Sequence, residues 1–151
     1  MGRKKRGDVM PLQVANRMSK PPLSIRDDAD YRTAFDIMRK RHVHHVPVVN
    51  PKGVVVGMLA ERDLLLAANH YQNAPVEAQD VMHSPVVTAF KRTPLAKAAR
   101  TMLAKKIGGL PVVDAKRRLL GMITETDVLR EFVGLLGKGG AKPPKNSRDK
   151  R

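Results

Sequence analysis

The sequence contains no cysteine and no tryptophan, and its only aromatic residues are two Tyr and three Phe among 151 residues. Disulfides and thiolate metal sites are therefore excluded, and the core must be built from aliphatic side chains and Met. No run of 18 apolar residues is present. The basic residues 1–6 are followed by Gly7 and Asp8 rather than by the apolar segment of a signal peptide. We expect a cytoplasmic protein that makes no contact with a membrane.

The formal net charge of +15 is unevenly distributed along the chain. Residues 1–10 carry +3, residues 137–151 carry +5, and residues 11–136 carry +7. The two ends have few apolar side chains to bury, so we expect a flexible basic N-terminus at 1–10 and a disordered basic tail at 137–151. A basic chain attracts anionic partners, which include nucleic acids and phosphorylated small molecules. Charge alone does not choose between them.

The sequence repeats itself at an offset of 64 residues without a gap. When residues 14–68 are laid on residues 78–132, 13 positions are identical. The identical positions include Pro47-Val48-Val49 with Pro111-Val112-Val113, Gly57-Met58 with Gly121-Met122, and Asp63 with Asp127. An unbroken offset of this length indicates a tandem duplication.

Each copy has the pattern of a β-α-β-β-α unit, and the fold class is therefore α+β. We predict a first strand at 22–25 and 86–88, and a first helix at 30–41 and 93–105, the latter capped by Thr93 with Pro94 at its first position. Hairpins are predicted at 46–49 with 54–59 and at 110–113 with 119–123, and last helices at 61–69 and 125–136. One copy of about 55 residues buries too little surface to be stable alone. We expect repeats at 11–69 and 80–136, joined by a linker at 70–79, to pair through their strands about a pseudo-twofold axis.

Two segments carry a resemblance to a known family. Residues 80–88 read Asp-Val-Met-His-Ser-Pro-Val-Val-Thr, and residues 121–127 read Gly-Met-Ile-Thr-Glu-Thr-Asp. Each copy resembles a CBS domain, and the resemblance covers residues 12–136. It implies a tandem CBS pair, or Bateman module, with clefts for an adenosine-containing ligand such as AMP, ADP, ATP or S-adenosylmethionine. It also implies a homodimer with a regulatory role toward a partner protein that the sequence does not identify.

The resemblance assigns ligand contacts to the end of the second copy. Asp127 would accept hydrogen bonds from the ribose hydroxyls, because a carboxylate takes two hydroxyl donors. Thr124 would face phosphate or ribose where backbone N–H groups at the start of a helix favour an anion. The alternative is structural: Thr124 caps the last helix and Asp127 belongs to its first turn.

The first copy departs from this pattern. It keeps Asp63 but has Ala60 where the hydroxyl should be, and Arg62 is either a replacement phosphate contact or a solvated side chain. Before its second strand it has His44 and His45, similar to the phosphate-contacting stretch of the regulatory subunit of AMP-activated protein kinase. The second copy has Gly108 and Gly109 there. The resemblance implies that these histidines hold the phosphates of the nucleotide on Asp127, and that the two clefts are unequal.

Other interpretations of the histidines and of the whole chain remain open at this point. Neighbouring strand residues point to opposite faces, so at most one of His44 and His45 enters a cleft on a regular strand. His42 and His44 could share a metal, although no carboxylate accompanies them at ligand spacing, or the histidines could be structural. We find no nucleophile with a base, no paired carboxylates and no metal set, and so expect neither an enzyme nor a catalytic cofactor. The rival functions are nucleic-acid binding through the basic tails and core, and a ligand-free scaffold.

Overall fold

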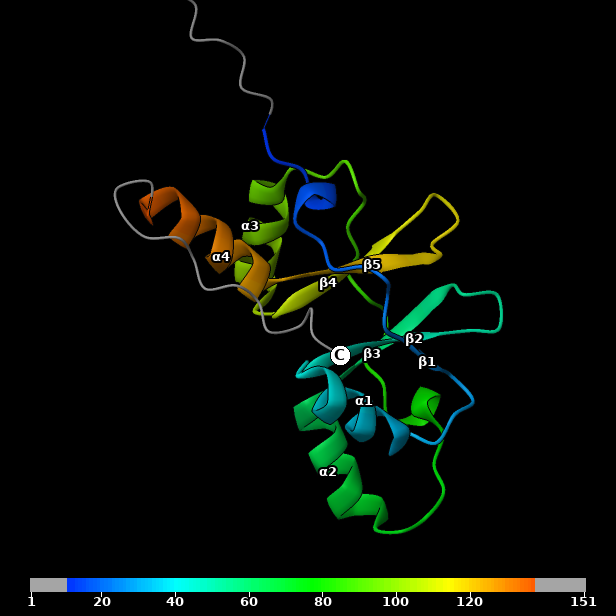
Figure 1. Cartoon of the computed structure of the whole chain (residues 1–151). Coiled ribbons are helices and arrows are strands. Elements are labelled where there is room, and N and C mark those ends of the chain that lie inside the picture. Colours follow the sequence, from blue (N-terminus) through cyan, green and yellow to red (C-terminus); the bar gives the residue numbers. More distant parts are fainter. Residues whose placement is uncertain (1–10, 138–151) are drawn as a thin grey trace, which may run out of the picture.

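The computed structural model describes residues 11–137, in which two similar units face each other through their strands (Figure 1). The first unit comprises β1 (Ile25–Arg26), α1 (Thr33–Arg41), β2 (His45–Val49), β3 (Val55–Ala60) and α2 (Glu61–Tyr71). The second comprises α3 (Leu95–Lys105), β4 (Gly109–Val113), β5 (Leu119–Thr124) and α4 (Glu125–Leu136). A short 3-10 helix precedes each unit: η1 (Val14–Asn16) and η2 (Ala78–Asp80). The predicted tandem α+β architecture is confirmed.

Each unit is built on an antiparallel hairpin. Val48 pairs with Gly57 in the β2–β3 hairpin, and Val112 pairs with Gly121 in the β4–β5 hairpin. β1 adds a parallel strand beside β2. In the second unit the predicted strand at 86–88 does not form, and a single parallel bridge from Ala89 to Val112 stands in its place. No helix within residues 11–137 has both the length and the apolar character needed to span a bilayer.

The first helix of each unit begins later than the sequence predicts. α1 begins at Thr33 rather than at residue 30, since Tyr31 donates its N–H to the carbonyl of Val76. α3 begins at Leu95, and the Thr93 hydroxyl accepts the N–H of Phe90 instead of capping the helix. The predicted Thr93 cap is therefore wrong. At both places the chain is bonded to a segment from outside the unit, Tyr31 to Val76 and Leu95 to Leu12.

Those bonds come from two segments that exchange places between the units. We call residues 11–19 the first arm and residues 76–83 the second arm. Val14 and Met18 of the first arm lie in the core of the second unit, whereas Ala78 of the second arm lies in the core of the first. In Figure 1 the first arm (blue) runs beside α3 before the chain enters the first unit. Each unit is thus completed by the segment that precedes the other.

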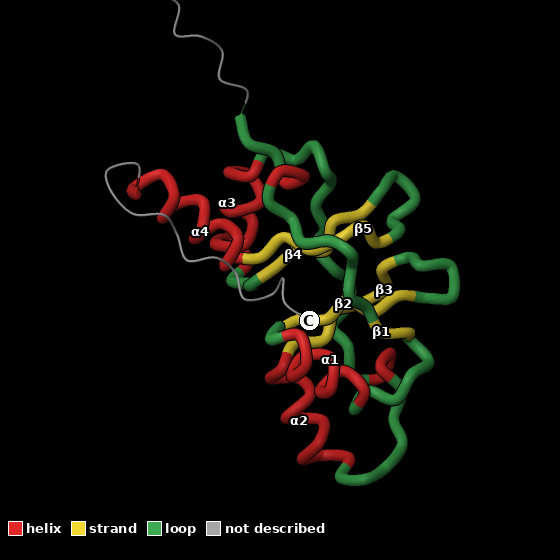
Figure 2. Tube along the Cα trace, viewed as in Figure 1, coloured by secondary structure: helices red, strands yellow, loops and turns green. Residues whose placement is uncertain are grey.

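The arms cross the central strands at equivalent points. Ser19 forms an antiparallel bridge with Met122, and His83 forms one with Met58. The crossing needs a glycine, because a Cβ on Gly121 would meet the carbonyl oxygen of Ser19. The two hairpins also meet directly, through a bridge between Val54 and Arg118. Figure 2 shows the resulting arrangement, with the strands in the middle and the helices on the outside.

The core is aliphatic, as expected, with one exception. Tyr31 is fully buried in the core of the first unit, with the ring of Tyr71 beside it, and its hydroxyl has no hydrogen-bond partner among the described residues. A smaller apolar cluster of Val49, Val55 and Val113 joins the two hairpins. The units are therefore held together by shared apolar surface as well as by the exchanged arms.

Candidate ligand site

The two aspartates predicted to bind ribose occupy equivalent positions on the first turns of α2 and α4. The Oδ2 atom of Asp63 accepts the backbone N–H of Ala60 at 2.9 Å. The Oδ2 atom of Asp127 accepts the backbone N–H of Thr124 at the same distance. The side chains are only 12% and 10% exposed, respectively. Each carboxylate is therefore held in place by the backbone at the start of its own helix.

Thr124 is the N-cap residue of α4, as the structural alternative predicts, and its hydroxyl also donates to Oδ2 of Asp127 at 3.0 Å. Ala60 cannot make the equivalent bond to Asp63. In the second unit, two donors thus orient one carboxylate oxygen, which leaves the other oxygen as the group directed to a partner.

The other oxygen has a different partner in each unit, and the sequence pointed to neither. Oδ1 of Asp63 lies 2.6 Å from Nε2 of His83, which belongs to the second arm. Oδ1 of Asp127 lies 3.4 Å from a guanidinium nitrogen of Arg130, on the same helix. The 64-residue offset contains the signal that distinguishes them, because it lays His83 on Ser19 and Arg130 on Leu66.

His44 and His45 point to different surroundings, as the strand geometry predicts. Nδ1 of His44 lies 2.9 Å from a carboxylate oxygen of Glu61, within the same unit. His45 reaches the other unit, since a Cβ on Gly108 would lie 2.8 Å from its Cε1 atom. The carbonyl of Gly108 accepts the first N–H of α4, at Glu125. The structure thus brings His45 to the beginning of the helix that carries Asp127.

The position between the units affects the titration of His45. Burial lowers its pKa below the ordinary value, and the neighbouring His44 lowers it further. The carboxylates of Glu125 and Asp63 act in the opposite direction. The imidazole is therefore disposed to be neutral near pH 7 in the ligand-free protein.

Two further expectations concern Arg62 and metals. Arg62 is exposed on the first turn of α2, and its role as a phosphate contact stays a prediction. Within the described range, no three or more His, Asp or Glu side chains gather in a group able to hold a metal ion. The basic segments 1–10 and 138–151, to which flexibility and nucleic-acid contacts were assigned, lie outside the described residues.

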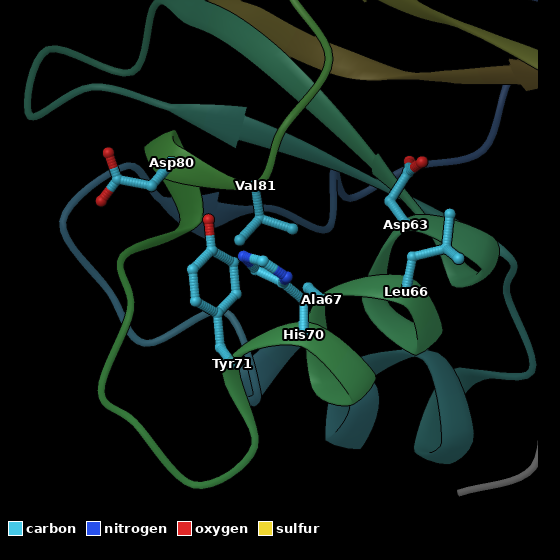
Figure 3. A pocket seen from close by; sticks show the side chains of 7 residues that line it. All are labelled: Asp63, Leu66, Ala67, His70, Tyr71, Asp80 and Val81. Atoms are coloured by element: carbon cyan, nitrogen blue, oxygen red, sulfur yellow. The ribbon is translucent and has the colours of Figure 1, made fainter.

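One groove, of about 270 Å³, adjoins Asp63. It lies between one face of α2 and the second arm, and its other lining residues are Leu66, Ala67, His70, Tyr71, Asp80 and Val81. Figure 3 shows Tyr71 and Asp80 at one end and the Asp63 carboxylate at the other, directed toward the strands. The volume is at the lower limit for a small-molecule site. The groove shows that the surface beside Asp63 is hollow, although the sequence motif favours Asp127 as the ligand contact.

Comparison with known proteins shows that both units match the CBS domain. The sequence model of the CBS domain matches residues 12–70 and again residues 78–134. A CBS domain pair solved in complex with 5-methylthioadenosine and S-adenosyl-L-methionine is 31% identical, with a TM-score of 0.76, and the match covers 83% of this chain and 98% of that one. The structure of CBSX2 in complex with AMP is 25% identical, with a TM-score of 0.73, covering 82% of this chain and 98% of that chain.

A much longer protein is similar over the same region. The L-aspartate semialdehyde sulfurtransferase of Methanocaldococcus jannaschii is 31% identical over 121 residues, which are 80% of this chain. The match covers only 23% of that enzyme. The likeness therefore concerns the paired units and carries no information on the rest of the enzyme.

Proposed function

Since the chain belongs to the CBS domain family and contains a pair of such domains, we propose that it is a regulatory module that binds an adenosine-containing ligand between them. The observation that carries the proposal is Asp127. It is a charged residue that is only 8% exposed, and its Oδ2 atom accepts hydrogen bonds from the backbone N–H and the hydroxyl of Thr124. Burial of a carboxylate is costly unless it is hydrogen-bonded, so a position of this kind is typical of a binding site.

The similar pairs indicate the class of ligand. One was solved with S-adenosyl-L-methionine and 5-methylthioadenosine, and another with AMP. All three molecules share adenosine, whose ribose diol matches a carboxylate acceptor. We therefore assign the ribose to Asp127, and to Asp63 in a second and unequal cleft. The module itself performs no chemistry in this proposal, and ligand occupancy is signalled to a partner protein.

His45 supports a phosphate contact near Asp127. It lies against Gly108, whose carbonyl accepts the first N–H of α4, and the positive end of that helix dipole favours an anion. A bound phosphate would favour the charged imidazole and so oppose the effect of burial on its pKa. We assign His44 a lesser part, because it is paired with Glu61. AMP should then bind more tightly than adenosine, and the difference should shrink in His45→Ala.

We also propose that the module is a homodimer. α4 exposes an apolar stripe at helical spacing, formed by Leu129, Phe132, Val133 and Leu136, each at least half exposed. Contiguous apolar surface of this kind marks an interaction site, and a second copy of the module offers the same stripe. Helix-to-helix pairing of two copies would remove it from water.

The deciding experiment is calorimetric titration of the full chain with AMP and S-adenosylmethionine, with melting temperatures measured alongside. Wild type should gain about 2.7 kcal/mol of stability at a ligand concentration of a hundred times the dissociation constant. Asp127→Ala should abolish this gain, whereas Asp63→Ala, the matched change in the other unit, should largely preserve it. Equal losses in the two variants would contradict unequal clefts. A wild type that binds no adenosine-containing ligand would refute the function.

A further inference from the structure

The second arm places a histidine on the carboxylate that the first cleft would offer to a ligand. Nε2 of His83 lies 2.6 Å from Oδ1 of Asp63, although the two residues are 20 positions apart in the chain. The Asp63 side chain is 12% exposed, whereas the His83 side chain is 73% exposed. An imidazole on the surface therefore covers a largely buried acceptor.

The position of this imidazole is fixed by the backbone. His83 donates its N–H to the carbonyl of Met58 at 2.9 Å and accepts the N–H of Met58 at 3.0 Å. Met58 lies on β3, the strand that leads directly into the helix of Asp63. The side chain thus reaches the carboxylate without any rearrangement of the arm, and only its own rotation would remove it.

The second cleft lacks this arrangement. Ser19 occupies the equivalent crossing point, and its short hydroxyl donates to the carbonyl of Met122 at 3.3 Å. Among residues 11–137, the Oδ1 atom of Asp127 is bonded to the guanidinium of Arg130, at 3.4 Å, from a side chain that is 42% exposed. A contact of that length is weaker than one at 2.6 Å. A ligand therefore displaces a strong competitor at Asp63 and a weak one at Asp127.

We propose that His83 is a built-in competitor that occupies the ribose acceptor of the first cleft, so that this cleft fills only when a ligand displaces the imidazole. The inference rests on the proposed function, because it concerns the same class of ligand. Oδ2 of Asp63 accepts the N–H of Ala60, and Oδ1, the oxygen that would receive a ribose hydroxyl, is already in contact with His83. The identity of one arm residue, His83 or Ser19, then sets the difference in affinity between the clefts.

The test exchanges the two arm residues in the full chain and uses AMP as the probe. In calorimetric titrations, wild type should show one strong site. His83→Ser should strengthen the weaker site by about tenfold, the value of one charge-assisted hydrogen bond at the lower end of its range. Ser19→His should weaken the strong site by a similar factor. Because both substitutions keep the backbone bonds of the arms, urea denaturation should show folded proteins in each case.

The controls separate this inference from the function on which it rests. Adding Asp63→Asn to His83→Ser should cancel the gain, because the released acceptor is then missing. If wild type binds AMP but His83→Ser leaves both sites unchanged, the competitor role is wrong and the proposed function stands. A weaker site in His83→Ser would make His83 a ligand contact and would also overturn the inference. If neither wild type nor His83→Ser binds AMP or S-adenosylmethionine, the proposed function fails and this inference falls with it.

Discussion

Replacing Gly121 by Ala tests whether the first arm crosses the central strand of the second unit. A Cβ at this position would meet the carbonyl oxygen of Ser19 and the terminal methyl of Met18. The oxygen belongs to the backbone of the first arm, which is anchored to the strand by the hydrogen bonds between Ser19 and Met122. It cannot move without breaking that bridge. The new methyl group therefore forces the arm away from the strand.

The equivalent change in the other unit, Gly57→Ala, supplies the control. There the Cβ would meet the side chain of Met82, a flexible thioether that can adopt another rotamer. Neither glycine has a positive φ, so Ala can adopt the backbone conformation at both sites. Any difference in stability between the two variants therefore reflects the atoms that the new methyl group meets and not a change in backbone conformation.

Overpacking of this kind costs about 1–3 kcal/mol. We expect Gly121→Ala to reach the upper half of that range, which corresponds to a melting temperature lower by roughly 4–12 °C in a chain of this size. Gly57→Ala should cost about 1 kcal/mol or less, because loss of chain entropy in the unfolded state offsets part of the strain. Urea denaturation followed by circular dichroism measures both, with unchanged m-values. Equal stability of the two variants would show that the first arm does not cross β5 as described.

Three further outcomes are expected. Burial lowers the pKa of His45, so the folded chain binds a proton at this residue less tightly than the unfolded chain does. The pKa of His in the unfolded chain is about 6.5. The free energy of unfolding should therefore fall as the pH drops below that value. Urea midpoints at pH 7.5 and 5.5 should differ less in His45→Gln than in wild type, and an equal difference would contradict the burial. In sedimentation experiments Leu129→Glu should raise the dimer dissociation constant by about tenfold or more, whereas Leu103→Glu, on the highly exposed α3 position, should leave it unchanged. A chain of residues 11–136 should bind AMP as tightly as the full chain and should lose most of any affinity for nucleic acid. If its nucleic-acid binding instead showed the same dependence on salt concentration as that of the full chain, the basic surface would lie on the folded units.

The local elements of this protein were predictable because they depend on short-range patterns. Short apolar segments joined by turn formers specified both hairpins, in which Val48 pairs with Gly57 and Val112 with Gly121. The helices that begin at Glu61 and Glu125 were placed at the correct residue. The 64-residue offset by itself makes Asp63 and Asp127 equivalent. The predicted strand at 86–88 is replaced by a single bridge at Ala89, and the Thr93 cap failed because its hydroxyl accepts the N–H of Phe90.

The exchange of the arms was decided by the tertiary structure alone. A duplication at a fixed offset is equally compatible with arms that fold back on their own unit, because the same apolar residues, such as Val14 and Ala78, would be buried either way. The distinction depends on how the two units pack, and hence on contacts between residues far apart in the chain, such as Val14 with Thr93 and Ala78 with Ala29. The contact of His83 with Asp63 and the approach of His45 to Gly108 are consequences of that packing. The sequence therefore determined which residues each unit contributes, and the packing of the units determined that a histidine of the second arm meets Asp63 and not Asp127.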